Sequence, residues 1–128
     1  MLPHALLPKS TAYDSFAQWR DDGTWAKMMQ ALRAQTRVAA GRESTPSAAC
    51  LESPSVKTTE VGGPARGSDG GKKITGRKRH LLVDTLAWVL ALLMTSAGLD
   101  DGVAASLLLG HVTPQDFPRL VIIFADQK

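Results

Sequence analysis

The sequence contains little cysteine, few aromatic residues and no long uncharged run, and each of these limits the kind of protein that the chain can be. Its single cysteine, Cys50, excludes an internal disulfide and any zinc site built from several cysteines. Only 5% of the 128 residues are aromatic, although the 44% hydrophobic content is ordinary for a globular protein. A chain of this length has room for one domain, or for a domain with an incomplete neighbour. The near absence of cysteine fits a reducing, cytoplasmic location.

The sequence also has no strong membrane or export signal. Its start, MLPHALLPKS, lacks the charged beginning and the long apolar core of a signal peptide. One segment, residues 85–99, could pass for a membrane span. It holds 15 residues without a charge, fewer than the roughly 18–20 that cross a bilayer, and acids flank it on both sides. We therefore expect no membrane partner.

Positive charge is concentrated in one short segment. The net charge of +3 and the isoelectric point of about 9.3 are modest, but residues 66–79 hold six of the 15 lysines and arginines against one acid, Asp69. A charge run is usually a solvated face, whereas a local basic cluster can also contact nucleic-acid phosphates. The six candidates for DNA contact are Arg66, Lys72, Lys73, Arg77, Lys78 and Arg79.

Residues 10–40 are predicted to form two helices, within a helical segment that covers residues 1–41. Thr11 and Asp14 stand at capping-box spacing, and Asp21-Asp22-Gly23 is a stop signal, after which Thr24 can cap the second helix. Gly41 is placed to end it. The apolar residues recur at helical spacing, which is consistent either with a helix-turn-helix that reads DNA or with simple packing. They are Tyr13, Phe16, Trp19, Trp25, Met28, Met29 and Leu32.

The second part of the chain, residues 42–128, has the pattern of strands with few helices. Residues 48–51, 79–86, 88–96 and 120–125 are candidate strands, and a break near residues 84–87 indicates a hairpin. One buried helix over residues 81–97 is the competing interpretation, because leucine and alanine favour helix. A short helix is expected over residues 101–109. The glycine-rich segment 53–76 is predicted to be a long, mobile loop.

Two of the predicted strands end in a carboxylate. Glu52 follows the run that ends at Leu51, and Asp126 follows LVIIFA, residues 120–125. If the two strands are neighbours in one sheet, both acids emerge at the same edge. Paired carboxylates there can hold Mg²⁺ for phosphoryl-transfer chemistry, although acids are also common where a strand simply returns to water. Spacing alone leaves both alternatives open.

Longer strings carry more information than these short patterns. The string SPSVKTTEVGGPARGSDGGKKITGRKRHLLVDTL, with LPKSTAYDSFAQWRDDGTW before it and FPRLVIIFAD after it, closely resembles bacterial insertion-sequence transposases of the DDE class, in the groups numbered four and five. The resemblance runs from about Leu7 to Asp126. It implies an α/β fold, with a partial ribonuclease-H-like mixed sheet preceded by a helical hairpin. It also implies Mg²⁺-assisted hydrolysis at transposon ends, followed by strand transfer into DNA.

The resemblance assigns roles to the two strand-end acids and also shows where this chain departs from the family. The first catalytic acid and metal ligand falls on Glu52, where the family has Asp, and the second falls on Asp126. The third, a Glu on a later helix, has no counterpart before Lys128. Pro54 replaces the usual glutamine, and Ala87 stands where a turn glycine is expected.

These departures lead us to expect a transposase-derived fragment, truncated at both ends, that binds DNA through the basic segment and is catalytically inactive. Two alternatives stay open. One is a non-enzymatic DNA-binding regulator that competes with full-length transposase or forms mixed multimers with it. The other is a pseudogene product without function, in which an exposed sheet face and edge would invite aggregation.

Overall fold

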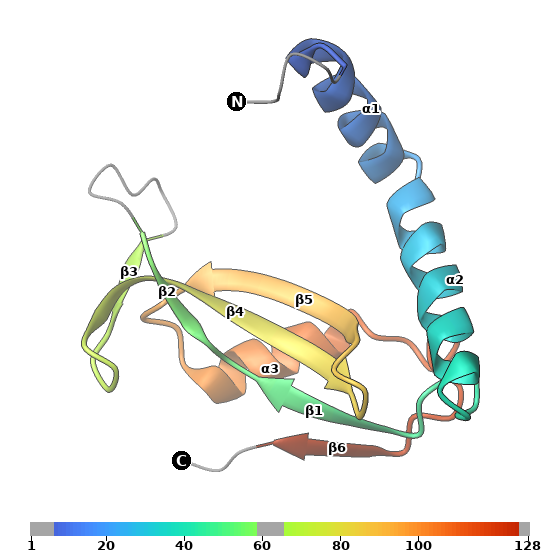
Figure 1. Cartoon of the computed structure of the whole chain (residues 1–128). Coiled ribbons are helices and arrows are strands. Elements are labelled where there is room, and N and C mark those ends of the chain that lie inside the picture. Colours follow the sequence, from blue (N-terminus) through green and yellow to red (C-terminus); the bar gives the residue numbers. More distant parts are fainter. Residues whose placement is uncertain (1–6, 59–65, 126–128) are drawn as a thin grey trace. The chain divides into compact units, whose positions relative to one another are not determined.

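The computed structural model describes residues 7–58 and 66–125 (Figure 1). The chain divides into two compact units, Met1–Ser44 and Thr45–Lys128, and each is described by itself. The first is a helical hairpin and the second is an α/β unit with a mixed sheet. Asp126 lies outside the described residues. Among the described helices, none combines the length and the apolar character that crossing a bilayer requires.

The first unit contains the two expected helices, α1 (Lys9–Asp21) and α2 (Thr24–Ala39). Aromatic packing joins them close to their connection. The ring of Trp25 lies 5.7 Å from that of Phe16 and 5.4 Å from that of Trp19, between ring centroids. Its indole N–H also donates to the carbonyl oxygen of Phe16 at 3.3 Å. The periodic aromatic residues therefore hold the hairpin at its turn.

The helix caps differ from the sequence prediction. Helix α1 begins at Lys9 after Pro8, with no side-chain cap, so Thr11 already lies inside the first turn and the expected capping box does not form. Thr24 is likewise the first residue of α2 rather than its cap; its N–H donates to Asp22 Oδ1 at 2.8 Å. The prediction for Gly41 is confirmed, because its φ of 71° ends α2 in the left-handed conformation.

The second unit is built around one long strand, β4 (Ile74–Asp84). On one edge β4 pairs with β1 (Ala48–Glu52) and then β2 (Ser55–Lys57); on the other it pairs with β5 (Val89–Ser96) and β3 (Gly67–Asp69). All four pairings are antiparallel. The last strand, β6 (Ile122–Ala125), lies parallel to β1 at the edge of the sheet.

The hairpin prediction for residues 79–96 is confirmed, and the alternative of one helix over residues 81–97 is wrong. The strands β4 and β5 pair along most of their length, and Asp84 closes the turn by accepting from the N–H groups of Leu86 and Trp88 at 2.9 Å each. The short helix α3 (Asp101–Gly110) also forms as expected. The hairpin forms in place of one helix because the two halves of residues 79–96 pair with each other as antiparallel strands.

The prediction of a long loop over residues 53–76 is wrong for the described part of this segment. It contains β2, β3 and the first residues of β4. Gly76 shows why glycine is compatible with a strand here: an added Cβ would lie 2.0 Å from the carbonyl oxygen of Val56. Glycine therefore allows two strands to approach closely at this point.

Helix α3 covers one face of this sheet, where the core lies (Figure 1). Ala49 from β1, Leu82 from β4 and Leu108 from α3 form its buried centre. The opposite face, which we call the open face, presents exposed apolar side chains. They are Leu92, Met94, Ile122 and Phe124.

Ala87 provides the first test of this fold. Its φ is 63°, a left-handed conformation that costs an L-residue roughly 1–2 kcal/mol and that glycine adopts freely. We expect Ala87→Gly to raise the free energy of unfolding by about 0.5–1 kcal/mol, measured by urea denaturation. The matched control is Ala105→Gly in α3, which should lower it by about 1 kcal/mol. Equal effects of the two substitutions would contradict the assigned turn.

Candidate functional site at the acid-bearing strand end

The parallel pairing of β1 with β6 brings the ends of these two strands to the same edge of the sheet. Leu51 is the register partner of Ala125, so Glu52 lies at the edge of the sheet where β6 ends. That following residue, Asp126, is outside the described part of the chain. A cavity of about 700 Å³ opens beside this edge. Its polar lining includes Glu52, Ser53, Lys72, Asp100 and Asp101.

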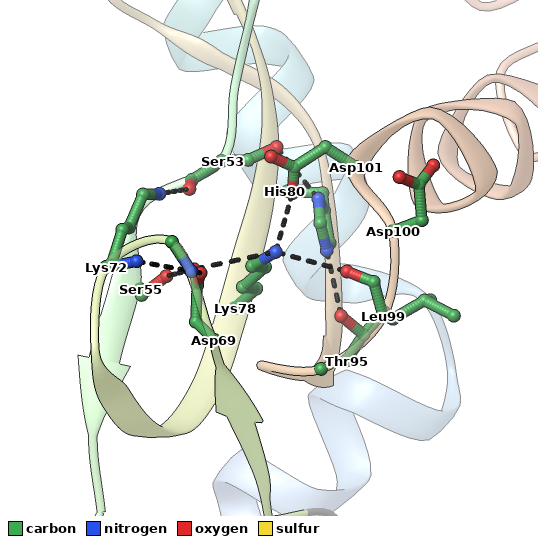
Figure 2. A network of polar contacts seen from close by, with 12 residues as sticks. Ser53, Ser55, Asp69, Lys72, Lys78, His80, Thr95, Leu99, Asp100 and Asp101 are labelled. Atoms are coloured by element: carbon green, nitrogen blue, oxygen red, sulfur yellow. Dashed lines mark hydrogen bonds and ion pairs between the residues drawn. The ribbon is translucent and has the colours of Figure 1, made fainter. Parts of the chain in front are cut away.

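Ser53, directly after Glu52, lies opposite His80. The β1–β4 register pairs Glu52 with Leu81, and the β2–β4 register pairs Ser55 with Lys78, which leaves Ser53 facing His80. The His80 Nδ1 atom lies 2.9 Å from Ser53 Oγ, and its Nε2 atom lies 2.8 Å from Thr95 Oγ1 (Figure 2). His80 is completely buried. Its ring therefore bridges the acid-bearing end of β1 to β5.

Lys72 reaches the same residue, Ser53, from the β3–β4 hairpin. Its Nζ donates to the carbonyl oxygen of Ser53 at 2.8 Å (Figure 2). The hairpin itself is fixed by Asp69, whose Oδ1 accepts from the N–H of Gly71 at 3.1 Å and from that of Lys72 at 3.0 Å, while Ser55 Oγ donates to Oδ2 at 2.9 Å. The Lys72 N–H and then the Ser55 hydroxyl are the main causes that lower the pKa of Asp69 to about 2.

Lys78 is buried in an ion-pair network rather than directed to solvent. Only 6% of the residue is exposed. Its Nζ lies 3.0 Å from Asp101 Oδ1 and 3.6 Å from Asp69 Oδ2, and it donates to the carbonyl oxygen of Leu99 at 3.1 Å (Figure 2). Burial by itself lowers the pKa of Lys78, but the interactions with Asp101 and Asp69 outweigh it and raise the pKa overall. Lys78 thus ties β4 to the start of α3.

The six basic residues of the sequence prediction are therefore in different environments. Arg66, Lys72, Lys73 and Arg79 are exposed, Arg77 is half-buried, and Lys78 is buried. Alternation along β4 separates them, because Lys78 and His80 face α3 whereas Arg77 and Arg79 face the other side. Lys73 adopts a left-handed φ of 51° at the hairpin turn. Exposure makes four of the six accessible to a phosphate backbone.

The described residues do not fit a resident Mg²⁺ ion. Among them, no three histidine, cysteine or acidic side chains are grouped so that they could hold a metal. The other acids of the cavity are already engaged: Asp100 Oδ1 accepts from the N–H groups of Gly102 and Val103 at the start of α3, and Asp101 pairs with Lys78. Lys72 adds a positive charge to the same lining. We therefore assign no chemical step to a metal.

Several residues of this site were missed in the sequence analysis. In the sequence alone, Asp69 is the lone acid of a basic segment and Asp101 is the start of a predicted helix. His80 was assigned no role, because an isolated histidine gives no signal without its partners. The predicted strand covered only residues 79–86, whereas β4 begins at Ile74; a strand extended back to residue 77 would have put Lys78 and His80 on one side.

Comparison with protein families identifies a match for the second unit. The family model described as the transposase DDE domain matches residues 43–128, which include every described strand and α3. The search of curated proteins found no match, and neither did the search of solved structures.

Asp69 gives a pH-dependent test of the network. Its folded-state pKa of about 2 is below the ordinary value of 3.8, so its contribution to stability is complete above about pH 4 and is lost as the pH falls through about 2. We expect Asp69→Asn to be less stable than the wild type at pH 7 and to show a flatter loss of stability between pH 4 and pH 2. Urea unfolding over this range measures both. Parallel curves for the two proteins would show that Asp69 does not carry the effect.

Proposed function

The chain belongs to the transposase DDE family, and we propose that this protein binds DNA through exposed cations of its β3–β4 segment and does not cleave DNA on its own. The family is one that acts on DNA. Within it, we propose that the chain is of the insertion-sequence type, groups four and five. The observation that carries the DNA-binding proposal is the exposure of four cations in the β3–β4 segment, one of which, Lys72, lines the cavity beside Glu52.

The exposed cations suit contact with the DNA backbone. Arg66, Lys72 and Lys73 lie on or beside the β3–β4 hairpin, and Arg79 follows on β4. Contact with about four phosphates gives a slope of about −3.6 in a plot of log affinity against log salt concentration, whereas six contacts would give about −5.4. The burial of Lys78 and the partial burial of Arg77 favour the smaller value.

Glu52 is the reason for proposing that cleavage is absent. A glutamate is one methylene longer than the aspartate of the family pattern, which moves its carboxylate by roughly 1 Å or more. Mg²⁺ requires near-octahedral geometry at about 2.1 Å, and a displacement of about 1 Å can reduce a rate about a hundredfold. The described residues offer no further grouping of ligands to offset this change.

A second candidate function is regulation of a full-length transposase through mixed multimers. The exposed apolar side chains of the open face, such as Leu92 and Phe124, favour this candidate because exposed patches of this kind are frequent at protein contacts. Strand-transfer assays with an intact family member measure the effect directly. Inhibition by this chain at concentrations where it does not bind DNA would support regulation through protein contacts, and inhibition only at DNA-binding concentrations would support simple competition.

Removing two exposed cations tests the DNA interface. We expect Lys73→Gln with Arg79→Gln to lower affinity for a duplex of mixed sequence and to reduce the salt slope by about two, because two phosphate contacts are lost. Fluorescence anisotropy at several salt concentrations measures both quantities. The matched control is Lys27→Gln in α2, an exposed lysine of the helical unit. If this control reduced the slope and the double variant did not, the interface would belong to the helical hairpin.

Replacing Lys78 tests whether this lysine stabilises the fold or contacts DNA. We expect Lys78→Met to lower the free energy of unfolding by roughly 2 kcal/mol, because Asp69 and Asp101 lose a buried partner. At temperatures where the variant stays folded, its salt slope for DNA should equal that of the wild type. A slope reduced by about one, with stability unchanged, would instead place Lys78 at the DNA interface.

A further inference from the structure

The residue that follows Glu52 is held from two sides. The hydroxyl group of Ser53 is hydrogen-bonded to His80 at 2.9 Å, and its carbonyl oxygen accepts from Lys72 Nζ at 2.8 Å. The carbonyl oxygen of the next residue, Pro54, accepts from the N–H of Arg79 at 3.0 Å. The two residues between β1 and β2 are therefore held alongside β4 rather than forming a loose connection.

The hydrogen bonds around His80 indicate which ring nitrogen carries the proton. The Thr95 hydroxyl group has one hydrogen and two acceptors within reach, His80 Nε2 at 2.8 Å and the carbonyl oxygen of Ser96 at 3.1 Å. We assign the hydrogen to the bond with Ser96, so that His80 Nε2 donates to Thr95 and His80 Nδ1 accepts from the hydroxyl of Ser53. In this assignment the chain of donors runs from Ser53 through His80 and Thr95 to a backbone oxygen of β5.

We propose that His80 and Lys72 are positioning residues for Glu52: together they clamp Ser53 and so fix where the carboxylate at the end of β1 lies. The proposal concerns the geometry of the strand end. It does not depend on DNA binding, and failure of the DNA experiments would leave it intact.

The surroundings of His80 support this role over simple filling of the core. A leucine could occupy the same space beside Leu82 and Leu93, but it would leave the hydroxyl groups of Ser53 and Thr95 without their partner. The groups facing the ring also keep it neutral. Burial lowers the pKa of His80; Lys78 and Lys72 act in the same direction, and Asp101 opposes them. A neutral ring retains the acceptor that Ser53 needs.

Nuclear magnetic resonance on the whole chain tests the donor arrangement, because the sequence has only three histidines. We expect the His80 ring nitrogens to show the neutral form with the proton on Nε2, and Ser53→Ala to move the Nδ1 signal. The matched control is Ser106→Ala, which removes a hydroxyl that donates to a backbone oxygen within α3 and should leave that signal in place. A proton on Nδ1, or no response to Ser53→Ala, would contradict this order of donors and acceptors.

The positioning effect is measured at Glu52 itself. We expect Ser53→Ala, His80→Met and Lys72→Met each to broaden or shift the Glu52 carboxyl ¹³C signal and to speed amide exchange of residues 51–53 about tenfold, the loss of roughly one hydrogen bond. Lys72→Arg, which keeps a donor, should restore the wild-type signal. Ser53→Ala combined with His80→Met should have no more effect than the larger single change, because both remove the same contact.

The outcomes separate positioning from general stability. If His80→Met fails to fold, Ser53→Ala and Lys72→Met test the clamp at the surface of the cavity, where no large side chain is lost. Signals of Glu52 that stay unchanged in both of these variants would overturn the proposal. Exchange that rises equally in α3 and in residues 51–53 would overturn it as well, because the effect would then be global.

Discussion

The pairing of β4 on both of its edges is the constraint on which the rest of the α/β unit depends. Its eleven residues bind β1 and β2 on one side and β3 and β5 on the other. Because side chains alternate along a strand, this pairing divides the residues of β4 between two faces. The face towards α3 holds Lys78, His80 and Leu82, and the other holds Arg77, Arg79 and Leu81. The sequence GRKRHLLV thus places cations on both faces, with different consequences.

Burying polar groups on the α3 face requires that each of them has a partner. The ammonium of Lys78 lies among Asp101, Asp69 and a backbone oxygen, and both nitrogens of His80 are hydrogen-bonded. Breaking a buried pair is costly, whereas the net gain from forming it is small. Such a network therefore contributes more to the arrangement of its elements than to total stability. Here it connects β1, the β3–β4 hairpin, β5 and the start of α3.

Local patterns were sufficient to predict much of this architecture. Helix periodicity gave α1 and α2, the apolar runs gave β1, β5 and β6, and the break near Asp84 gave the hairpin. The glycine-rich segment was misassigned because β2 and β3 are each three residues long and owe their strand conformation to pairing with β4. The cap of α2 was misassigned because Thr24 is a favourable cap residue in sequence, whereas in the structure Gly23 occupies the cap position with a φ of 78° and Thr24 is the first helical residue.

The candidate site was predictable only to the level of strand ends. Sequence placed Glu52 at the end of β1 and Ala125 at the end of β6, and their parallel pairing is a tertiary fact that no local pattern contains. The burial of individual residues in the basic segment is also not contained in any local pattern. Which of its lysines is buried depends on Asp101, which lies 23 residues beyond Lys78 in the chain and comes near it only when α3 packs on the sheet.

The β3–β4 hairpin contributes both to the position of the acid at the end of β1 and to the proposed DNA-binding surface. Asp69 fixes the hairpin backbone at Lys72 and lies beside Lys78, so the turn that presents Lys73 to solvent also directs Lys72 towards Ser53. A phosphate backbone bound to this hairpin would therefore act on Ser53, the residue next to Glu52. Because alternate residues of β4 serve the interior and the surface, the exposed cation Arg79 can be changed while the buried network stays whole. The two properties can then be separated by substitution even though one strand carries both.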